Sequence, residues 1–141
     1  MDEFKIGYDL VIDEIPEGAR VLDLGCGDGT LLKLLHEQKK VSGFGVEISE
    51  EGVSQCVEKG VYCYQADIDE GLSDYRDNSF DYVILNQTIQ NTKRPDYVIK
   101  EVLRIGKKAI VSFPNFGYYR TRSYLMFKGT KLFGTTNPEA E

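Results

Sequence analysis

The stretch VLDLGCGDGT, residues 21–30, holds the residues in this sequence that are best suited to bind a ligand. Glycine occupies every second position at Gly25, Gly27 and Gly29, directly after an apolar run, and Asp23 stands two residues before the first glycine. Glycine adopts unusual backbone dihedrals and lets the backbone approach a ligand closely. The spacing therefore predicts a turn after a strand that lies against a bound molecule.

Two classes of nucleotide site use such a turn. The dinucleotide fingerprint G-x-G-x-x-G would place its third glycine at position 30, where this sequence has Thr30. The spacing instead resembles the D-x-G-x-G-x-G loop of S-adenosylmethionine-dependent methyltransferases. An acid beside the loop would repel a pyrophosphate but suits the ammonium group of S-adenosylmethionine, so Asp23, and Asp28 as a second candidate, favour that cofactor. Cys26, inside the loop, belongs to the same set of candidate contacts.

Further candidates stand where later strands are expected to end. Glu47, followed by Ile48, comes about twenty residues after the loop, where a carboxylate can accept hydrogen bonds from ribose hydroxyls. In Asp67–Ile68–Asp69, the first acid can accept from an adenine amino group while Ile68 packs on the ring. Asn86 follows the next strand, where a catalytic pocket should open. Each feature alone is common in turns and strand ends, but their order along the chain favours a cofactor site.

The elements that must position these residues alternate between strand and helix. Short apolar runs predict strands at 20–24, 43–48, 62–66, 80–86 and 109–113. Helices are expected at 8–15, 30–38, 50–59 and 95–105, and the polar stretch 73–79 is expected to be a loop. Nearly continuous apolar strands are typical of a parallel sheet that is buried on both faces. The pattern predicts a single α/β domain over 1–141 with a Rossmann-like, doubly wound, mostly parallel sheet.

At this point the chain resembles a class I S-adenosylmethionine-dependent methyltransferase domain and, more closely, the MetW proteins associated with methionine biosynthesis. The resemblance lies in VLDLGCGDGTLLKLL, GFGVEISEEGVSQCVEKGV, DIDEGL, SFDYVILNQTIQ and RPDYVIKEVLRIGKKAIVSFPNFGYYR. It implies a site for S-adenosylmethionine, with cofactor roles for Asp23, Gly25, Gly27, Glu47 and Asp67. It also implies a role in the acylated-homoserine route to methionine, with homoserine O-acetyltransferase as a protein partner.

The last part of the chain departs from the class I pattern. That fold usually has seven strands and ends in an antiparallel hairpin, whereas only five strands are readable here. The segment 113–141 mixes aromatic and basic residues with several glycines, so we expect the sheet to be truncated after the fifth strand and this segment to be incomplete. Its aromatics can bury against the sheet while its bases stay solvated, or the segment can contact a protein partner. The same mixture of aromatics and bases also occurs in nucleic-acid-binding segments, the least favoured of the three alternatives.

The sequence contains no convincing pair of acid and base catalysts. Asn86, Asn115 and Tyr118 are weak candidates for an acceptor pocket, and a thiol at Cys26 is better explained by packing. The only histidine, His36, falls late in a predicted helix, away from the expected site. This absence favours a binding or regulatory role, with an active methyltransferase on a small-molecule or protein acceptor as the alternative.

Composition narrows the class of protein further. The net charge of −6 argues against nonspecific nucleic-acid binding. No apolar run is long enough for a membrane helix, so we expect a cytoplasmic protein. The three cysteines are odd in number and lack close-paired spacing. Reduced core thiols are therefore expected rather than a disulfide framework or a zinc site, and no metal is predicted.

Overall fold

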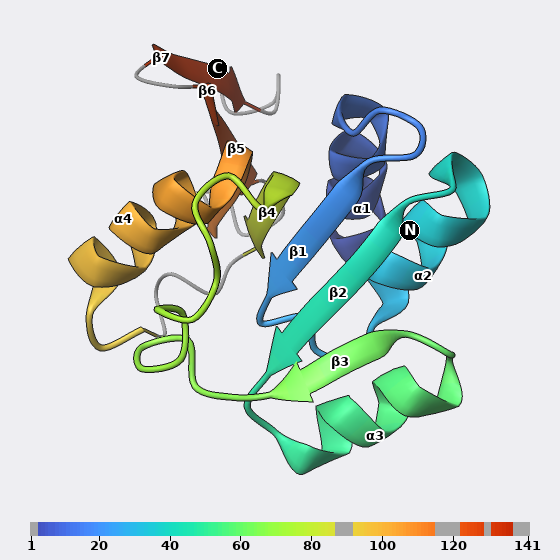
Figure 1. The fold of residues 1–141 in the computed structure, drawn as a ribbon. Coiled ribbons are helices and arrows are strands. Elements are labelled where there is room, and N and C mark those ends of the chain that lie inside the picture. Colours follow the sequence, from blue (N-terminus) through green and yellow to red (C-terminus); the bar gives the residue numbers. More distant parts are fainter. Residues whose placement is uncertain (1–2, 87–91, 115–121, 129–130, 137–141) are drawn as a thin grey trace.

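The computed structural model describes residues 3–86, 92–114, 122–128 and 131–136, with the side chains of 7–85 and 92–111. Helices and strands alternate along most of this length (Figure 1). The helices are α1 (Glu3–Glu14), α2 (Thr30–Lys39), α3 (Glu50–Glu58) and α4 (Pro95–Ile105). The strands are β1 (Arg20–Leu24), β2 (Ser42–Glu47), β3 (Tyr62–Gln65), β4 (Phe80–Asn86), β5 (Gly106–Pro114), β6 (Arg122–Lys128) and β7 (Lys131–Thr136).

The strands form one sheet in the order β3-β2-β1-β4-β5-β6-β7. The first five strands are parallel, which confirms the predicted doubly wound α/β fold. The chain moves outward from β1 through β2 to β3 and then returns to the other side of β1 with β4. The strand order therefore reverses beside β1, and the glycine loop that follows β1 lies at this topological switch point, where ligands bind in such sheets.

Strand register brings the candidate residues to one edge of the sheet. Leu24 at the end of β1 is level with Val46, and Glu47 at the end of β2 is level with Gln65 at the end of β3. Parallel strands all point their carboxyl ends the same way. The segments that follow β1, β2 and β3 therefore emerge side by side.

Two apolar clusters cover the two faces of the sheet, so α1 and α2 lie on one side and α4 on the other (Figure 1). On α2 the buried side chains are Leu31, Leu32 and Leu35, spaced as one helical face. On α4 they are Val98, Val102 and Ile105. The central strands are buried on both faces, which explains their nearly continuous apolar sequences.

The sheet does not end after its fifth strand, so the expected truncation there is wrong. Strand β6 pairs antiparallel with β5, and β7 pairs antiparallel with β6 up to the register pair Lys128 and Lys131. Bases at the strand ends and Gly134 inside β7 hide the alternation that predicts a strand. Two residues, one of them Gly129, separate the two strands. A short connection with a glycine is typical of a β-hairpin, but in the sequence alone it can also be interpreted as the end of regular structure.

Smaller differences concern where elements begin. Helix α1 begins at Glu3 rather than at residue 8, and β5 begins at Gly106, directly after α4. Gly106 has extended backbone angles, φ −99° and ψ 143°, so the helix passes straight into the strand without a left-handed turn. The polar segment 73–79 is a loop, as expected, and Arg104 of α4 holds it by donating to the carbonyls of Leu72 and Tyr75.

Gly45 in the middle of β2 is required by packing. A Cβ at this position would lie 2.5 Å from Cys26 Sγ and 3.2 Å from Leu32 Cδ1. We expect Gly45→Ala to lower the free energy of unfolding by about 1–3 kcal/mol, because the neighbouring side chains must shift in a filled core. Urea unfolding measures this change, with Ser42→Ala on the exposed end of the same strand as the control. Equal stability of the two variants would contradict the packing.

Candidate functional site

The glycine loop has the backbone conformation that its spacing predicts. Gly25, Gly27 and Gly29 all have positive φ, at 76°, 59° and 83°. Residues with a Cβ rarely adopt these angles, so glycine at every second position follows directly from the path of the loop. The loop turns the chain from the end of β1 into α2 within five residues.

The N–H groups of this loop are already used inside the protein. Gly25 and Cys26 both donate to the carbonyl of Val46, at 2.7 and 3.1 Å, and Gly29 donates to the carbonyl of Cys26 at 3.1 Å. Gly27 donates to Glu47 Oε1 at 3.0 Å. A pyrophosphate site would need several of these groups to point at the ligand. Their use elsewhere argues against a dinucleotide in this loop.

An acidic side chain also covers the start of α2. Asp28 Oδ1 accepts from the backbone N–H of Thr30 at 3.0 Å and from its hydroxyl at 2.7 Å. Burial opposes the charge of Asp28, but these bonds and Lys59, 3.6 Å away, lower the pKa of the carboxyl below its usual value. The helix end that would attract a phosphate therefore already carries an anion.

Glu47 connects the loop to α3. Its Oε1 accepts from Gly27, and its Oε2 accepts from the N–H and the hydroxyl of Ser49, at 3.0 and 2.8 Å. Ser49 is in turn the N-cap of α3, since its Oγ accepts from the N–H of Gly52 at 3.0 Å. A carboxylate offers about four acceptor positions, so three internal donors leave room for about one more on Oε1. A second ligand hydroxyl would have to replace Ser49.

A cleft of about 290 Å³ opens at this edge of the sheet. Five of the predicted residues line it: Gly25, Glu47, Ile48, Asp67 and Ile68. Four lining residues were not among the predicted contacts, namely Val46, Ala66, Asp69 and Thr92. Val46 and Ala66 flank predicted residues and could have been inferred from the strand ends, whereas nothing local in the sequence marks Thr92. Two other clefts, of about 370 and 270 Å³, lie at the amino ends of the strands, away from the loop.

The two isoleucines at the cleft differ in exposure. Ile48 is 63% exposed, whereas Ile68 is 8% exposed and belongs to the core cluster that packs on α4. An apolar side chain that is this exposed beside a cleft is available to a flat, apolar ligand group. The stronger candidate for contact with a ring is therefore Ile48, although the strand-end pattern favoured Ile68.

The acids after β3 have separate tasks. Asp67 Oδ1 accepts from the N–H of Asp69 at 2.9 Å, which fixes a tight turn. Asp69 is buried, and its two carboxylate oxygens accept from the N–H groups of Lys93 and Arg94, both at 3.0 Å. Arg94 is the N-cap residue of α4 and has no side-chain cap of its own, so Asp69 supplies that cap from a distance. Asp69 is thus structural, and Asp67 is the stronger binding candidate.

Asp23 is buried behind the loop and is not among the residues that line the cleft. Its Oδ1 has no hydrogen-bond partner within the described part of the chain. Burial, and secondarily the charge of Glu47, raise the pKa of Asp23 to about 7. An unsatisfied buried carboxyl next to an acidic cleft would gain from a positively charged ligand. The residues present therefore fit a cationic ligand with hydroxyl groups better than an anionic one.

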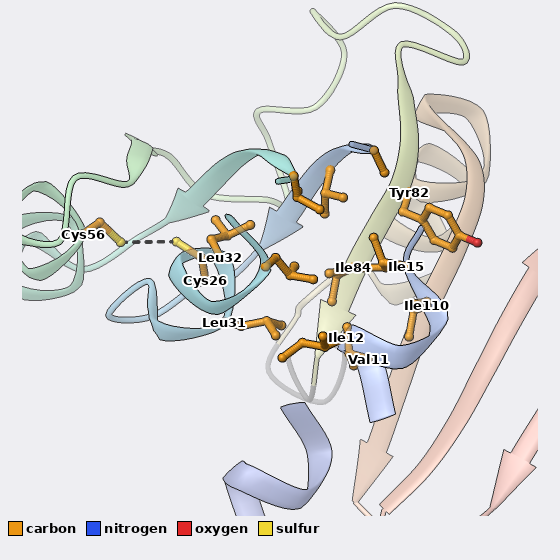
Figure 2. Close-up of a cluster of buried hydrophobic side chains, with 14 residues drawn as sticks. Val11, Ile12, Ile15, Cys26, Leu31, Leu32, Cys56, Tyr82, Ile84 and Ile110 are labelled. Carbon is orange, nitrogen blue, oxygen red and sulfur yellow. Dashed lines mark hydrogen bonds between the residues drawn. The ribbon is translucent and has the colours of Figure 1, made fainter. Parts of the chain in front are cut away.

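The remaining predicted residues are not part of the cleft as described. Cys26 does not line the cleft, and its Sγ lies 3.7 Å from Cys56 Sγ, which agrees with packing (Figure 2). Gly27 contributes through its bond to Glu47 rather than as a lining residue. Asn86 ends β4, but its side chain, like Asn115 and Tyr118, lies outside the described residues.

Comparison with known proteins decides the family. The sequence profile described as "Methionine biosynthesis protein MetW" matches residues 5–139. This chain belongs to the MetW family. A relative in Rhodopirellula baltica, described as "Bifunctional methionine biosynthesis protein MetXA/MetW", is 36% identical over 133 residues. The match covers 89% of this chain and 21% of the relative, so the chain spans about a fifth of that protein's length.

Solved structures share the fold of this MetW-family chain. A SAM-dependent methyltransferase from Archaeoglobus fulgidus matches with a TM-score of 0.71 and 24% identity over 80% of this chain and 52% of that one. A possible histamine N-methyltransferase from Thermotoga maritima matches with a TM-score of 0.68 and 25% identity over 82% and 53%. The [4+2]-cyclase SpnF matches with a TM-score of 0.69 and 26% identity over 77% and 44%. The class I methyltransferase fold is thus shown, in neighbours with different described activities.

In the described part of this MetW-family chain, no helix combines the length and apolar character that a membrane crossing requires.

The buried acid of the loop predicts an unusual pH dependence of stability. The pKa of Asp23 is about 7 in the folded chain, whereas an exposed aspartate has a pKa of about 3.8, so the unfolded chain loses this proton at a lower pH. The contribution of Asp23 to stability therefore falls as pH rises from about 4 to 7 and is least favourable above 7. Asp23→Asn should raise the free energy of unfolding at pH 8 by on the order of 2–4 kcal/mol.

The gain should shrink as the pH approaches 5, where Asp23 is protonated in the folded chain. Chemical denaturation at pH 5, 6.5 and 8 measures it, with the exposed Asp9→Asn as the control variant. An Asp23→Asn protein that is less stable than the natural sequence at pH 8 would show that the carboxylate is stabilised by a contact other than those described.

Proposed function

We propose that this chain binds S-adenosylmethionine in the cleft at the carboxyl ends of β1 to β3 and supports homoserine O-acetyltransferase in methionine biosynthesis. The observation that carries the first part is the acidic cleft beside a glycine loop whose N–H groups are used internally. Such a site disfavours phosphate and suits a cationic nucleoside. Membership of a methionine biosynthesis family supports the second part.

Different residues of the cleft would contact different groups of S-adenosylmethionine. Glu47 would accept from a ribose hydroxyl, Asp67 from the adenine amino group, and Ile48, with Ile68 behind it, would pack on the base. The positive φ of Gly25 lets the backbone pass close to the ligand, and Asp23 would supply negative charge near the ammonium end. When bound, S-adenosylmethionine would bring a methyl group on a sulfonium, the group that class I enzymes transfer.

The partner proposal rests on the relative from Rhodopirellula baltica. Its description joins MetXA and MetW in one bifunctional protein. The resemblance of this chain to MetW proteins implies homoserine O-acetyltransferase as the partner. Linking two modules in one chain raises their effective concentration and favours a contact that separate chains would make more weakly. We infer that this chain and an acetyltransferase associate when they are encoded apart.

Methyl transfer to an unidentified acceptor is the second candidate. It is favoured by the neighbour from Thermotoga maritima, which is described as a SAM-dependent methyltransferase. Incubation of the full-length protein with methyl-labelled cofactor and cell extract would reveal a labelled acceptor. Cofactor binding and complex formation without any label would support the binding role instead.

Glu47 provides the direct test of cofactor binding. Glu47→Ala and Glu47→Gln should each weaken S-adenosylmethionine binding by about 1–3 kcal/mol, because a charged hydrogen bond to a hydroxyl is lost. Titration calorimetry measures the affinity, and thermal unfolding shows whether the loop has kept its fold. The exposed Glu37→Ala serves as the control. Unchanged affinity in both Glu47 variants would remove this residue from the site.

The affinity should also depend on pH through Asp23. Below about pH 7 this carboxyl is protonated in the free protein and cannot favour a cation, so affinity should rise by up to about tenfold between pH 6 and 8. Asp23→Asn should bind more weakly at pH 8 and show a flat profile. The same slope in both proteins would mean that another group is responsible.

A complex with homoserine O-acetyltransferase from the same organism tests the partner proposal. We expect the two purified proteins to elute together in size-exclusion chromatography and acetyltransferase activity to rise when this chain is added. Separate elution at micromolar concentrations, with no change in activity, would refute the association while leaving cofactor binding intact.

A further inference from the structure

The fold brings all three cysteines of the chain together, although they are far apart in the sequence. Cys26 comes from the glycine loop, Cys56 from α3 and Cys63 from β3. Cys26 Sγ lies 3.7 Å from Cys56 Sγ and 3.6 Å from Cys63 Sγ, and all three sulfurs lie within 4.8 Å of one another. Figure 2 shows the Cys26 and Cys56 side chains pointing toward each other across the gap between the loop and α3.

Two glycines leave the space that these sulfurs occupy. A Cβ on Gly45 would lie 2.5 Å from Cys26 Sγ, and a Cβ on Gly29 would lie 2.9 Å from Cys56 Sγ. Any larger residue at either position would push a sulfur out of the group. The absence of a Cβ at Gly29 and Gly45 therefore leaves the space that the thiols of Cys56 and Cys26 occupy.

The group of three cysteines is buried at Cys26 and Cys56 and partly exposed to solvent at Cys63. Cys26 is 8% exposed and Cys56 is fully buried, whereas Cys63 on the edge strand β3 is partly exposed. A small ion could reach the sulfurs past Cys63, and a water molecule could complete its coordination there.

We propose that Cys26, Cys56 and Cys63 form a binding site for a thiophilic divalent cation of the zinc class. Zinc binds thiolates at about 2.3 Å in tetrahedral geometry, which sets neighbouring sulfurs about 3.8 Å apart. The separations of Cys26 Sγ from the other two sulfurs, 3.7 and 3.6 Å, are close to this value, so an ion fits with little movement of the side chains. A disulfide would join only two of the three sulfurs and leave the third as a free thiol. It would also shorten the distance between the two joined sulfurs to about 2 Å.

The binding step balances through release of protons. Three neutral thiols and one divalent cation give a complex with three sulfur–metal bonds and net charge −1, and three protons leave to solvent. Affinity should therefore rise with pH. No oxidant or reductant is involved.

A bound ion would act on the glycine loop. Cys26 stands between Gly25 and Gly27, and Cys56 Sγ donates to the carbonyl of Gly27 at 3.4 Å. A bound ion would replace that weak bond with a rigid connection between the loop, α3 and β3. This inference does not depend on the proposed function, because none of the three cysteines is among the residues that line the cleft.

Metal titration of the reduced full-length chain, under anaerobic conditions with a phosphine reductant, tests the proposal. We expect one Zn²⁺ per chain in competition with a chromophoric chelator, a higher melting temperature with Zn²⁺, and thiolate-to-metal charge-transfer absorption when Co²⁺ is used. Cys63→Ser, the least buried of the three changes, should weaken binding by about 100-fold or more, and Ser54→Ala on α3 should not.

The Co²⁺ spectrum is measured on the natural sequence, so the result does not depend on the folding of a variant. Absence of stoichiometric binding, with no thiolate absorption, would show that the thiols only pack. Equal affinity in Cys63→Ser would place the ion elsewhere. Each of these outcomes overturns the proposal.

Discussion

The bond from the Gly27 N–H to Glu47 Oε1 holds the candidate site together. It joins the loop after β1 to the end of β2, and the other oxygen of the same carboxylate reaches the N-cap of α3. One side chain thus fixes the positions of three elements that are separate in the sequence. A ligand that engages Glu47 would compete with, or add to, bonds that already stabilise the fold, so binding and local order are linked at this residue.

The electrostatics of this edge select against phosphate in two ways. The loop offers its N–H groups to carbonyl and carboxylate oxygens of the protein, and Asp28 occupies the start of α2. At the same time Asp23 is held in a buried place where its charge is unfavourable. Natural proteins keep such destabilising groups mainly at functional sites, where a ligand compensates for them. The same loop shape can therefore serve a different cofactor class from the dinucleotide folds.

Most of this arrangement could be predicted from the sequence, because it depends on local patterns. Glycine spacing gave the loop, and buried apolar runs gave the five parallel strands, with acids at their ends. Strands β6 and β7 were missed because antiparallel strands with Gly134 and terminal bases lack a clear alternation. The capping role of Asp69 and the meeting of Cys26, Cys56 and Cys63 were also missed. Both depend on contacts between distant segments, which spacing along the chain does not encode.

The order of the strands in the sheet should also affect the rate at which the chain folds. Pairing β1 with β4 brings Val21 beside Tyr82, 61 positions later, whereas β6 and β7 pair across a gap of two residues. Closing a long loop costs more chain entropy than forming a hairpin. The pairing of β4 with β1 should therefore limit the rate at which the chain folds. The ligand cleft, which needs β1, β2 and β3 in register, then becomes competent only once the parallel half has assembled.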